Sequence, residues 1–313
     1  MSLPIFVVAL VLVHLSCTTD ICSASRRLTS LYKPPPLVLK YHDGPLLDGD
    51  VPVSVVWYGR FAPSQKSIIS DFVLSLNPER SHPQQNAPSP APFVSSWWEP
   101  VQAYLQKAGR KDTRFVLSGQ FSDEDCSLGR ILKRFQISEL ARKANPKSHE
   151  LTIVLTAQDV AVEGFCSSGC GFHGSSDAGD SAFIWVGDST MQCPGQCAWP
   201  FQRPIYGPQT EPLVAPNGDV GADGMVINIG ALMASAVTNP FGKGFYMGSV
   251  SAPIEVGSAC TGSFGKGSYP GYAGELLVDL GNGASYNAVG VNGRKYLLPA
   301  LLDPETSQCR TIV

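Results

Sequence analysis

A single apolar stretch near the middle of the chain constrains the fold more than any other feature. Residues Met225–Val237 are apolar almost all round, interrupted only by one asparagine, one glycine and one serine. A helix that is apolar on every face has to be buried, so this stretch predicts a helix inside the main core. The glycine-rich, acidic turn before it offers Asp223 as the N-cap, and Pro240 marks the end of the helix.

Strand-like and helix-like segments alternate before this helix. Apolar and β-branched runs predict strands, whereas apolar residues at helical spacing predict helices. The predicted strands are Val51–Tyr58, Arg114–Gly119, Leu151–Ala157 and Ala182–Val186, and the predicted helices begin at Ser64, Ser96 and Ser127, the last running to Lys143. This order predicts an α/β fold, a single layered domain with a mostly parallel mixed sheet. The glycine-rich chain beyond Pro240 predicts a long, loop-rich, disulfide-bonded C-terminal part.

The N-terminus has the pattern of a secretory signal peptide. Leu3–Leu15 is apolar except for one histidine, and small residues follow around Ser23–Ser25. This apolar run is shorter than the roughly 20 residues that span a bilayer. We therefore expect a signal peptide over residues 1–24, a proline-containing lead-in over 25–40 and one globular domain over 41–313. The expected protein is secreted and has no membrane anchor.

The charge balance excludes one class of partner. A formal net charge of −3 provides no basic field, so nucleic acid is not an expected partner. Hydrophobic residues make up 43% of the chain and charged residues 16%, which is typical of a globular protein that buries a substantial core.

Seven cysteines lie well beyond the predicted signal peptide: Cys126, Cys166, Cys170, Cys193, Cys197, Cys260 and Cys309. Two pairs among them are four residues apart, a spacing that a structural zinc site allows, and His173 is nearby. We favour disulfides, because secreted proteins mature in an oxidising environment, and we expect no bound metal. The spacing does not define which cysteines pair.

His173 is the histidine with the most reactive neighbours in the sequence, since two cysteines and Asp177 lie close to it. Histidine can act as an acid or a base near neutral pH, but a lone histidine is more often structural. We treat His173, Asp177, Asp219 and Asp223 as candidate catalytic residues. The two latter aspartates could also bind Ca²⁺ together with Asn217, although a helix cap with an Asx turn is the favoured interpretation.

Five aromatic residues are candidates for stacking on sugar rings: Trp97, Trp98, Trp199, Tyr269 and Tyr272. Such stacking requires that the rings be exposed. Aromatic side chains at helix starts and in apolar neighbourhoods are more often part of the core.

Several long motifs resemble one plant family. They are Tyr41–Leu46 (YHDGPL), Val56–Gly59 (VWYG), Cys170–Gly174 (CGFHG), Gln192–Phe201 (QCPGQCAWPF), Ala215–Gly224 (APNGDVGADG) and Tyr269–Gly274 (YPGYAG). The chain resembles the phosphate-induced, or EXORDIUM and EXORDIUM-like, proteins over nearly all of its length after the signal. The resemblance implies a secreted protein of the plant apoplast or cell wall, linked to growth and brassinosteroid response. It implies no particular reaction.

A shorter resemblance concerns the buried helix and the segment Glu255–Cys260. The helix is similar to a zincin-type metalloprotease helix written His-Glu-Leu-x-Glu-x-x-Thr-Asp-Pro. Four aligned positions differ from that pattern: Ala231 replaces the metal-binding His, Leu232 the general-base Glu, Ser235 the next acidic ligand, and Ser258 a later Asp. The resemblance implies a zincin-like fold that has lost the residues for metal-assisted hydrolysis.

These observations support one leading hypothesis and two alternatives. The leading hypothesis is a non-enzymatic secreted protein, without a cofactor, that binds a cell-wall polysaccharide or an extracellular protein. The first alternative is a cell-wall hydrolase, which requires His173 within hydrogen-bond reach of a carboxylate in an open pocket. The second alternative is a carbohydrate-binding module that uses exposed aromatic residues.

Overall fold

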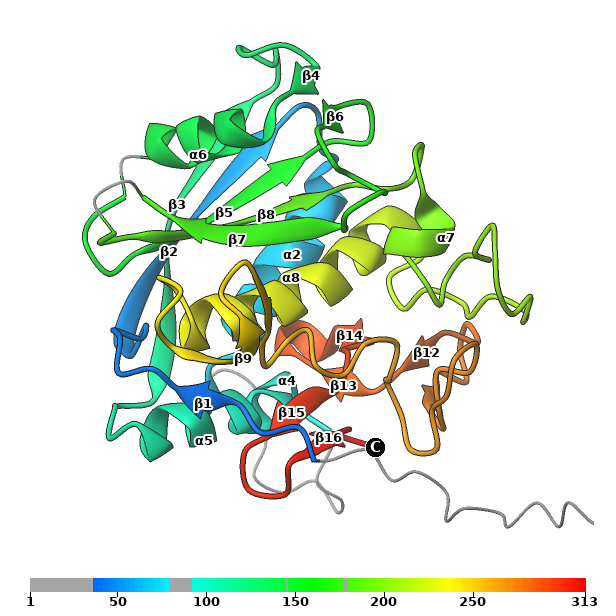
Figure 1. Ribbon diagram of the computed structural model, residues 1–313. Coiled ribbons are helices and arrows are strands. Elements are labelled where there is room, and N and C mark those ends of the chain that lie inside the picture. The colour runs from blue at the N-terminus through cyan, green and yellow to red at the C-terminus, as the bar shows by residue number, and fades with distance from the viewer. Residues whose placement is uncertain (1–35, 79–91, 145, 177–178) are drawn as a thin grey trace, which may run out of the picture. The chain divides into compact units, whose positions relative to one another are not determined.

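The central feature of the fold is a five-stranded sheet, seen in a computed structural model that describes residues 36–78, 92–144, 146–176 and 179–313 (Figure 1). The strand order is β3–β2–β5–β8–β7, with β7 antiparallel to β8 and the other neighbours parallel. The strands are β2 (Gly49–Tyr58), β3 (Thr113–Asp123), β5 (Leu151–Thr156), β7 (Gly171–Ser175) and β8 (Ala182–Gly187). The prediction of a mostly parallel mixed sheet is confirmed.

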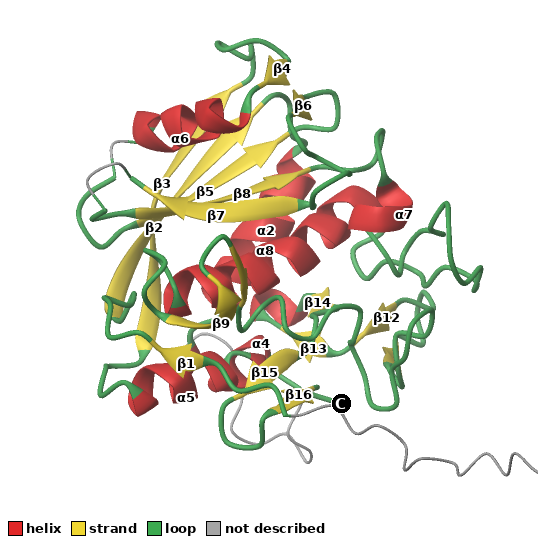
Figure 2. Cartoon of the chain, viewed as in Figure 1, coloured by secondary structure: helices red, strands yellow, loops and turns green. Residues whose placement is uncertain are grey.

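Helices cover both faces of this sheet (Figure 2). On one face, α6 (Arg134–Lys143) packs against β5 and β8. On the other face lie α2 (Pro63–Ser75) and α8 (Val220–Thr238), and α8 contacts β7 and β8. Every residue of β5 and β8 is buried, as expected for parallel strands that are covered on both faces.

The helix predicted from the apolar stretch is α8, and it begins earlier than predicted. Its N-cap is Asp219, whose side chain accepts a hydrogen bond of 2.9 Å from the N–H of Ala222. Asp223 therefore lies in the first turn and is not the cap. Among the described residues, α8 alone has the length and composition of a membrane span, and 78% of that window is buried inside the protein. It is accordingly a core helix.

Shorter elements complete the structure. The helical ones are α4 (Val94–Trp97), α5 (Glu99–Lys107), α7 (Pro194–Cys197) and the 3₁₀ helix η2 (Val291–Gly293). The short strands are β1 (Lys40–Tyr41), β4 (Ile131–Leu132), β6 (Ala161–Val162), β9 (Phe245–Ser249), β10 (Ala252–Ile254), β11 (Leu277–Val278), β12 (Ser285–Tyr286), β13 (Ala288–Val289), β14 (Lys295–Tyr296), β15 (Leu301–Asp303) and β16 (Gln308–Arg310). After α8 the chain thus contains short strands, the 3₁₀ helix η2 and the loops between them, in agreement with the predicted loop-rich C-terminal part.

The predicted helix from Ser127 to Lys143 is only partly correct, because helix forms only over α6. Before it, β4 pairs in parallel with β6, so those backbone groups bond across the fold. Gly129, at φ +86°, also interrupts a helical path. The predicted N-caps Ser64 and Ser96 are likewise corrected: both lie inside helices whose caps are the residues before Pro63 and Val94.

Three disulfides join six of the seven predicted cysteines: Cys166–Cys193, Cys170–Cys197 and Cys260–Cys309. The first two connect the chain just before β7 to α7, and the third fastens the C-terminal strands. The seventh, Cys126, departs from the expectation because its thiol is free and buried. Burial raises the pKa of the Cys126 thiol, which keeps it in the unreactive protonated form.

Some predictions fall outside the described residues. The predicted signal peptide (1–24) and residues 25–35 of the predicted lead-in are among them, as is Asp177. Residues Leu37–Val313 form one compact unit.

Candidate functional site

An open cleft lies beside the edge strand β7, where the end of α8 meets the turn after β10. Its volume is about 430 Å³. It is lined by Arg134, Phe172, His173, Gly174, Ser175, Asn239, Pro240, Phe241, Gly242, Tyr246, Val250, Ser251, Pro253, Glu255 and Ser258. We call it the His173 cleft, because the histidine selected from the sequence lies in its wall.

A buried carboxylate connects three walls of this cleft. Oε2 of Glu255 accepts a 2.8 Å hydrogen bond from Nε2 of His173, on β7. Oε1 accepts a 2.6 Å bond from the side-chain amide of Asn239, the C-cap of α8. Asn239 in turn accepts a 2.7 Å bond from the N–H of Gly244. Glu255 is only 5% exposed, and these two bonds occupy one lone pair on each of its oxygens, which offsets much of the cost of burying it.

The local chain geometry holds this carboxylate in place. The N–H of Glu255 donates to the hydroxyl of Ser258 at 2.9 Å, and its carbonyl accepts bonds from the N–H groups of Ser258 and Ala259. The turn is thereby closed on itself, and Glu255 points back into the protein toward His173. Pairing of His173 with Ile184 on β8 fixes the histidine backbone from the other side.

The imidazole of His173 has no nitrogen available to a ligand in the cleft. Nε2 bonds Glu255, and Nδ1 is buried without a hydrogen-bond partner among the described residues. A general base has to reach the proton that it removes. His173 therefore orients and supports Glu255 in this arrangement, and a ligand would meet the cleft walls around the pair.

Of the four zincin-aligned positions, Ala231 and Leu232 are half-buried and each is contacted by another part of the chain. A Cβ on Gly257 would collide with the backbone carbonyl of Ala231, so the turn after Glu255 packs directly on α8 there. A Cβ on Gly171 would meet the side chain of Leu232, so β7 packs on that residue. Ser235 is 2% exposed, within the core, and Ser258 lines the cleft.

The candidate aspartates Asp219 and Asp223 lie at the opposite end of α8 from His173. Sixteen residues separate Asp223 from Asn239, which at 1.5 Å per residue is roughly 24 Å. Both carboxylate oxygens of Asp223 accept bonds from Asn217, at 2.9 Å from its N–H and 2.6 Å from its amide. Asp219 caps the helix, as the favoured interpretation allowed for one of the two, whereas Asp223 bonds back to the turn before the helix. The structure does not bring these aspartates to the histidine.

Burial perturbs the acids at this end of the helix. It raises the pKa of Asp223 to about 7, against the lowering effect of the bonds from Asn217, with a smaller raising contribution from the charge of Asp219. Burial likewise raises the pKa of Asp188, opposed by its bonds from Thr190. No group of three or more His, Cys, Asp or Glu side chains suited to a metal ion occurs in the described part of the chain.

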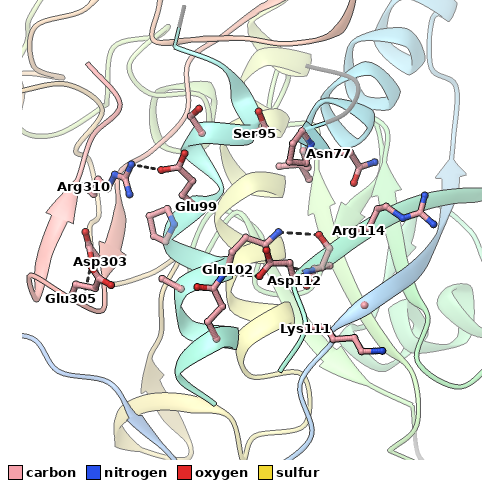
Figure 3. A pocket seen from close by; sticks show the side chains of 18 of the residues that line it. Asn77, Ser95, Glu99, Gln102, Lys111, Asp112, Arg114, Asp303, Glu305 and Arg310 are labelled. Carbon is pink, nitrogen blue, oxygen red and sulfur yellow. Dashed lines mark hydrogen bonds and ion pairs between the residues drawn. The ribbon is translucent and has the colours of Figure 1, made fainter. Parts of the chain in front are cut away.

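A second cavity, of about 790 Å³, lies between α5, the start of β3 and the β15–β16 hairpin (Figure 3). Sequence reasoning did not identify it, because its walls come from segments that are far apart in the chain. Four of its charged residues form two exposed ion pairs: Arg114 lies 2.6 Å from Asp50, and Arg310 lies 2.5 Å from Glu99. The other charged lining residues are three acids, Asp112, Asp303 and Glu305, and one base, Lys111, so the lining is acidic on balance.

The candidate stacking aromatics divide into two groups. Trp97 and Trp98 are buried, at 3% and 1% exposure, and belong to the core, and Trp199 packs against Phe264. Tyr269 and Tyr272 are 65% and 38% exposed, so only these two are well exposed.

Comparison with known proteins gives a consistent result. A family model described as “Phosphate-induced protein 1 conserved region” matches residues 39–312. Protein PHOSPHATE-INDUCED 1 of Nicotiana tabacum is 51% identical over 98% of each chain. From Arabidopsis thaliana, Protein EXORDIUM-like 1 is 52% identical over 87% of this chain and 89% of its own, and Protein EXORDIUM is 48% identical over 88% and 90%. No solved structure matches significantly. The chain belongs to the phosphate-induced, EXORDIUM-like protein family.

Proposed function

We propose that this protein is secreted to the plant apoplast or cell wall, where it acts in growth and brassinosteroid response by binding a wall component or an extracellular partner, without catalysing a reaction. Family membership and the three disulfides support an extracellular role. The relatives from Nicotiana and Arabidopsis support a plant setting.

The observation that carries the non-catalytic part of the proposal is the state of His173. Neither ring nitrogen is available for proton transfer in the cleft, since one bonds Glu255 and the other is buried. The hydrolase alternative required a carboxylate within reach of His173, and Glu255 meets that condition. Among the described lining residues Glu255 is the one carboxylate, whereas glycoside hydrolysis usually uses two.

The helix beside the cleft supports the same proposal. In the zincin-type motif, two histidines on one helical face bind the metal and a glutamate is the general base. The aligned side chains of Ala231 and Leu232 can neither bind a metal nor take a proton, and Gly257 and Gly171 pack against them. An antiparallel edge strand beside a core helix supports a zincin-like frame that serves as a scaffold. In such a scaffold the His173 cleft would bind a ligand without catalysing a reaction.

The proposal is tested with the purified mature protein and fractionated cell-wall material. Saturable retention on a wall fraction, with no release of soluble products, is the expected result. A His173→Gln variant should weaken retention, because it removes the imidazole ring from the cleft wall, although the amide can still donate to Glu255; Ser307→Ala, which changes a residue outside the cleft, is the control. Time-dependent product release by the native protein, lost in the His173→Gln variant, would establish the hydrolase alternative instead.

A second candidate function is saccharide binding by Tyr269 and Tyr272. Their ring centroids lie 5.2 Å apart, and each backbone N–H bonds the other's carbonyl, at 3.1 and 2.8 Å. Pro270 followed by Gly271 at φ +91° gives this turn the type II pattern. A rigid turn that presents two exposed rings is a feature of binding surfaces.

Replacing both tyrosines by alanine should abolish retention on a wall polysaccharide if this surface binds it. Tyr206→Ala, which removes a third exposed ring, provides a matched control. Unchanged retention of the double variant excludes the tyrosine pair and leaves the His173 cleft as the binding site.

A further inference from the structure

We infer that the His173 cleft binds a carboxylate-bearing saccharide, with the guanidinium of Arg134 as the anion-binding group. The inference rests on the proposed binding function and adds the chemical class of the ligand. Arg134 is the first residue of α6, and it lines the cleft on the side of β7.

The guanidinium of Arg134 is held in place without being neutralised. Its Cζ lies 3.9 Å from the centroid of the Phe172 ring, a cation–π contact that orients the planar group and leaves its N–H donors free. The carboxylate of Glu163 accepts a bond from the backbone N–H of Arg134 at 3.2 Å, not from its side chain, and lies 3.7 Å from Lys133. Within the described ranges, no salt bridge involves the Arg134 side chain.

Other arginines differ from Arg134 in that their guanidinium groups pair with acidic side chains. Between described residues, these arginines pair with acidic side chains: Arg114 with Asp50, Arg130 with Asp159, Arg203 with Glu211, Arg294 with Asp71 and Arg310 with Glu99. Arg134 instead lines the rim of the His173 cleft, where Glu255 is the one carboxylate among the described lining residues and bonds His173 and Asn239. No described acidic side chain pairs with the guanidinium, so its N–H donors are open to an anionic ligand in the cleft.

The remaining walls fit a sugar ring. The hydroxyls of Ser251 and Ser258 and the ring of Phe241 line the cleft. Tyr246, which is 7% exposed and stacks on His42 with centroids 3.8 Å apart, backs the same wall. Hydroxyl groups suit the hydroxyls of a saccharide, and aromatic rings suit its apolar C–H face. A guanidinium binds a carboxylate through two parallel hydrogen bonds. A uronic acid residue carries hydroxyl groups, an apolar C–H face and a carboxylate.

The test uses calorimetric titration of the mature protein with a short oligogalacturonate and with its methyl ester of equal length. The acid should bind and the ester should bind about tenfold to hundredfold more weakly, since esterification removes one charge-assisted contact. Arg134→Ala should weaken binding of the acid by the same factor and leave the ester unchanged. Arg134→Lys should restore only part of the loss, because lysine lacks the planar fork. Arg60→Ala, outside the cleft, is the charge-matched control.

The outcomes separate this inference from the proposed function. Equal binding of acid and ester, or no effect of Arg134→Ala, overturns the inference and leaves the binding function standing. Failure to bind either form, together with retention on a neutral wall polysaccharide, also overturns only the inference. If inorganic phosphate competes as strongly as the free uronate, the site binds oxyanions in general, and the proposal of a saccharide ligand is overturned. Absence of any wall ligand contradicts both.

Discussion

Nε2 of His173 lies 2.8 Å from Oε2 of Glu255, and this bond joins β7 to the turn after β10. The second oxygen of the same carboxylate bonds Asn239 at the end of α8. One buried side chain thus ties together the three elements that wall the cleft. The polar network fixes the shape of the cleft and at the same time occupies the groups that could otherwise act on a ligand.

Removing this carboxylate should destabilise the protein. Glu255→Ala leaves the buried donors of His173 and Asn239 without their acceptor, at a cost of about 2–4 kcal/mol in the free energy of unfolding. Urea unfolding measures this loss. Glu275→Ala, at an exposed position, should change stability by less than about 0.5 kcal/mol. Equal stability of the two variants would show that the network does not support the fold.

The packing of Gly257 on α8 should tolerate no side chain. A Cβ there would overlap the backbone carbonyl of Ala231, which cannot move without distorting the helix. Gly257→Ala should therefore lower the free energy of unfolding by more than about 2 kcal/mol. The control is Gly281→Ala, where the nearest atom to a new Cβ is 3.4 Å away. A neutral Gly257→Ala would mean that the space beside Ala231 is open.

The Cys170–Cys197 disulfide should stabilise the edge strand that carries His173. It lies just before β7, and the neighbouring Cys166–Cys193 bond spans the same separation of 27 residues. Removing Cys170–Cys197 alone therefore opens only a small additional ring, for which loop-closure entropy predicts about 2–3 kcal/mol. The paired replacement by serine should lower the melting temperature accordingly. Cys126→Ala, which removes a free thiol, should cost roughly 1 kcal/mol. A disulfide variant no less stable than Cys126→Ala would contradict this role.

Stability should fall as the pH rises from about 4 to about 7. The pKa of Asp223 is raised from 3.8 to about 7 in the folded protein, so the folded state binds this proton more tightly than the unfolded state does. The free energy of unfolding is then highest near pH 4 and decreases by about 2–4 kcal/mol up to pH 7. The raised pKa of Asp188 acts in the same direction.

Asp223→Asn isolates the contribution of Asp223. Chemical unfolding at several pH values measures how the free energy of unfolding changes with pH. Between pH 4 and 7 this change should be smaller in the variant than in the native protein, whatever the absolute stability of the variant. The exposed acids Asp50 and Asp279 have lowered pKa values, so their effects fall below this window. An unchanged slope would mean that Asp223 stays ionised in the folded state.

Much of the fold could be predicted because its main signals are local. The strands Leu151–Thr156 and Ala182–Gly187 are continuous apolar runs, and the core helix is apolar on every face, so composition alone identifies them. The edge strand β7 was missed, because Gly171–Ser175 contains no β-branched residue and two of its five residues are glycines. Only pairing with β8 makes it a strand.

The site was predictable only in part. His173 could be selected for its chemistry, but its partner Glu255 is 82 residues away. The carboxylates selected as its candidate partners were Asp177, Asp219 and Asp223 instead. The one signal that pointed to Glu255 was its place at the start of the segment aligned with the zincin pattern. Tertiary packing, which a sequence pattern does not report, brings the two residues together.

Isothermal titration calorimetry with wall oligosaccharides, the acidic ones first, distinguishes binding from catalysis at the His173 cleft. We expect a saturable isotherm in which heat flow returns to the baseline after every injection, with affinity reduced by Arg134→Ala. Heat flow that continues after each injection and disappears in His173→Gln would show turnover, and the cleft would then be catalytic.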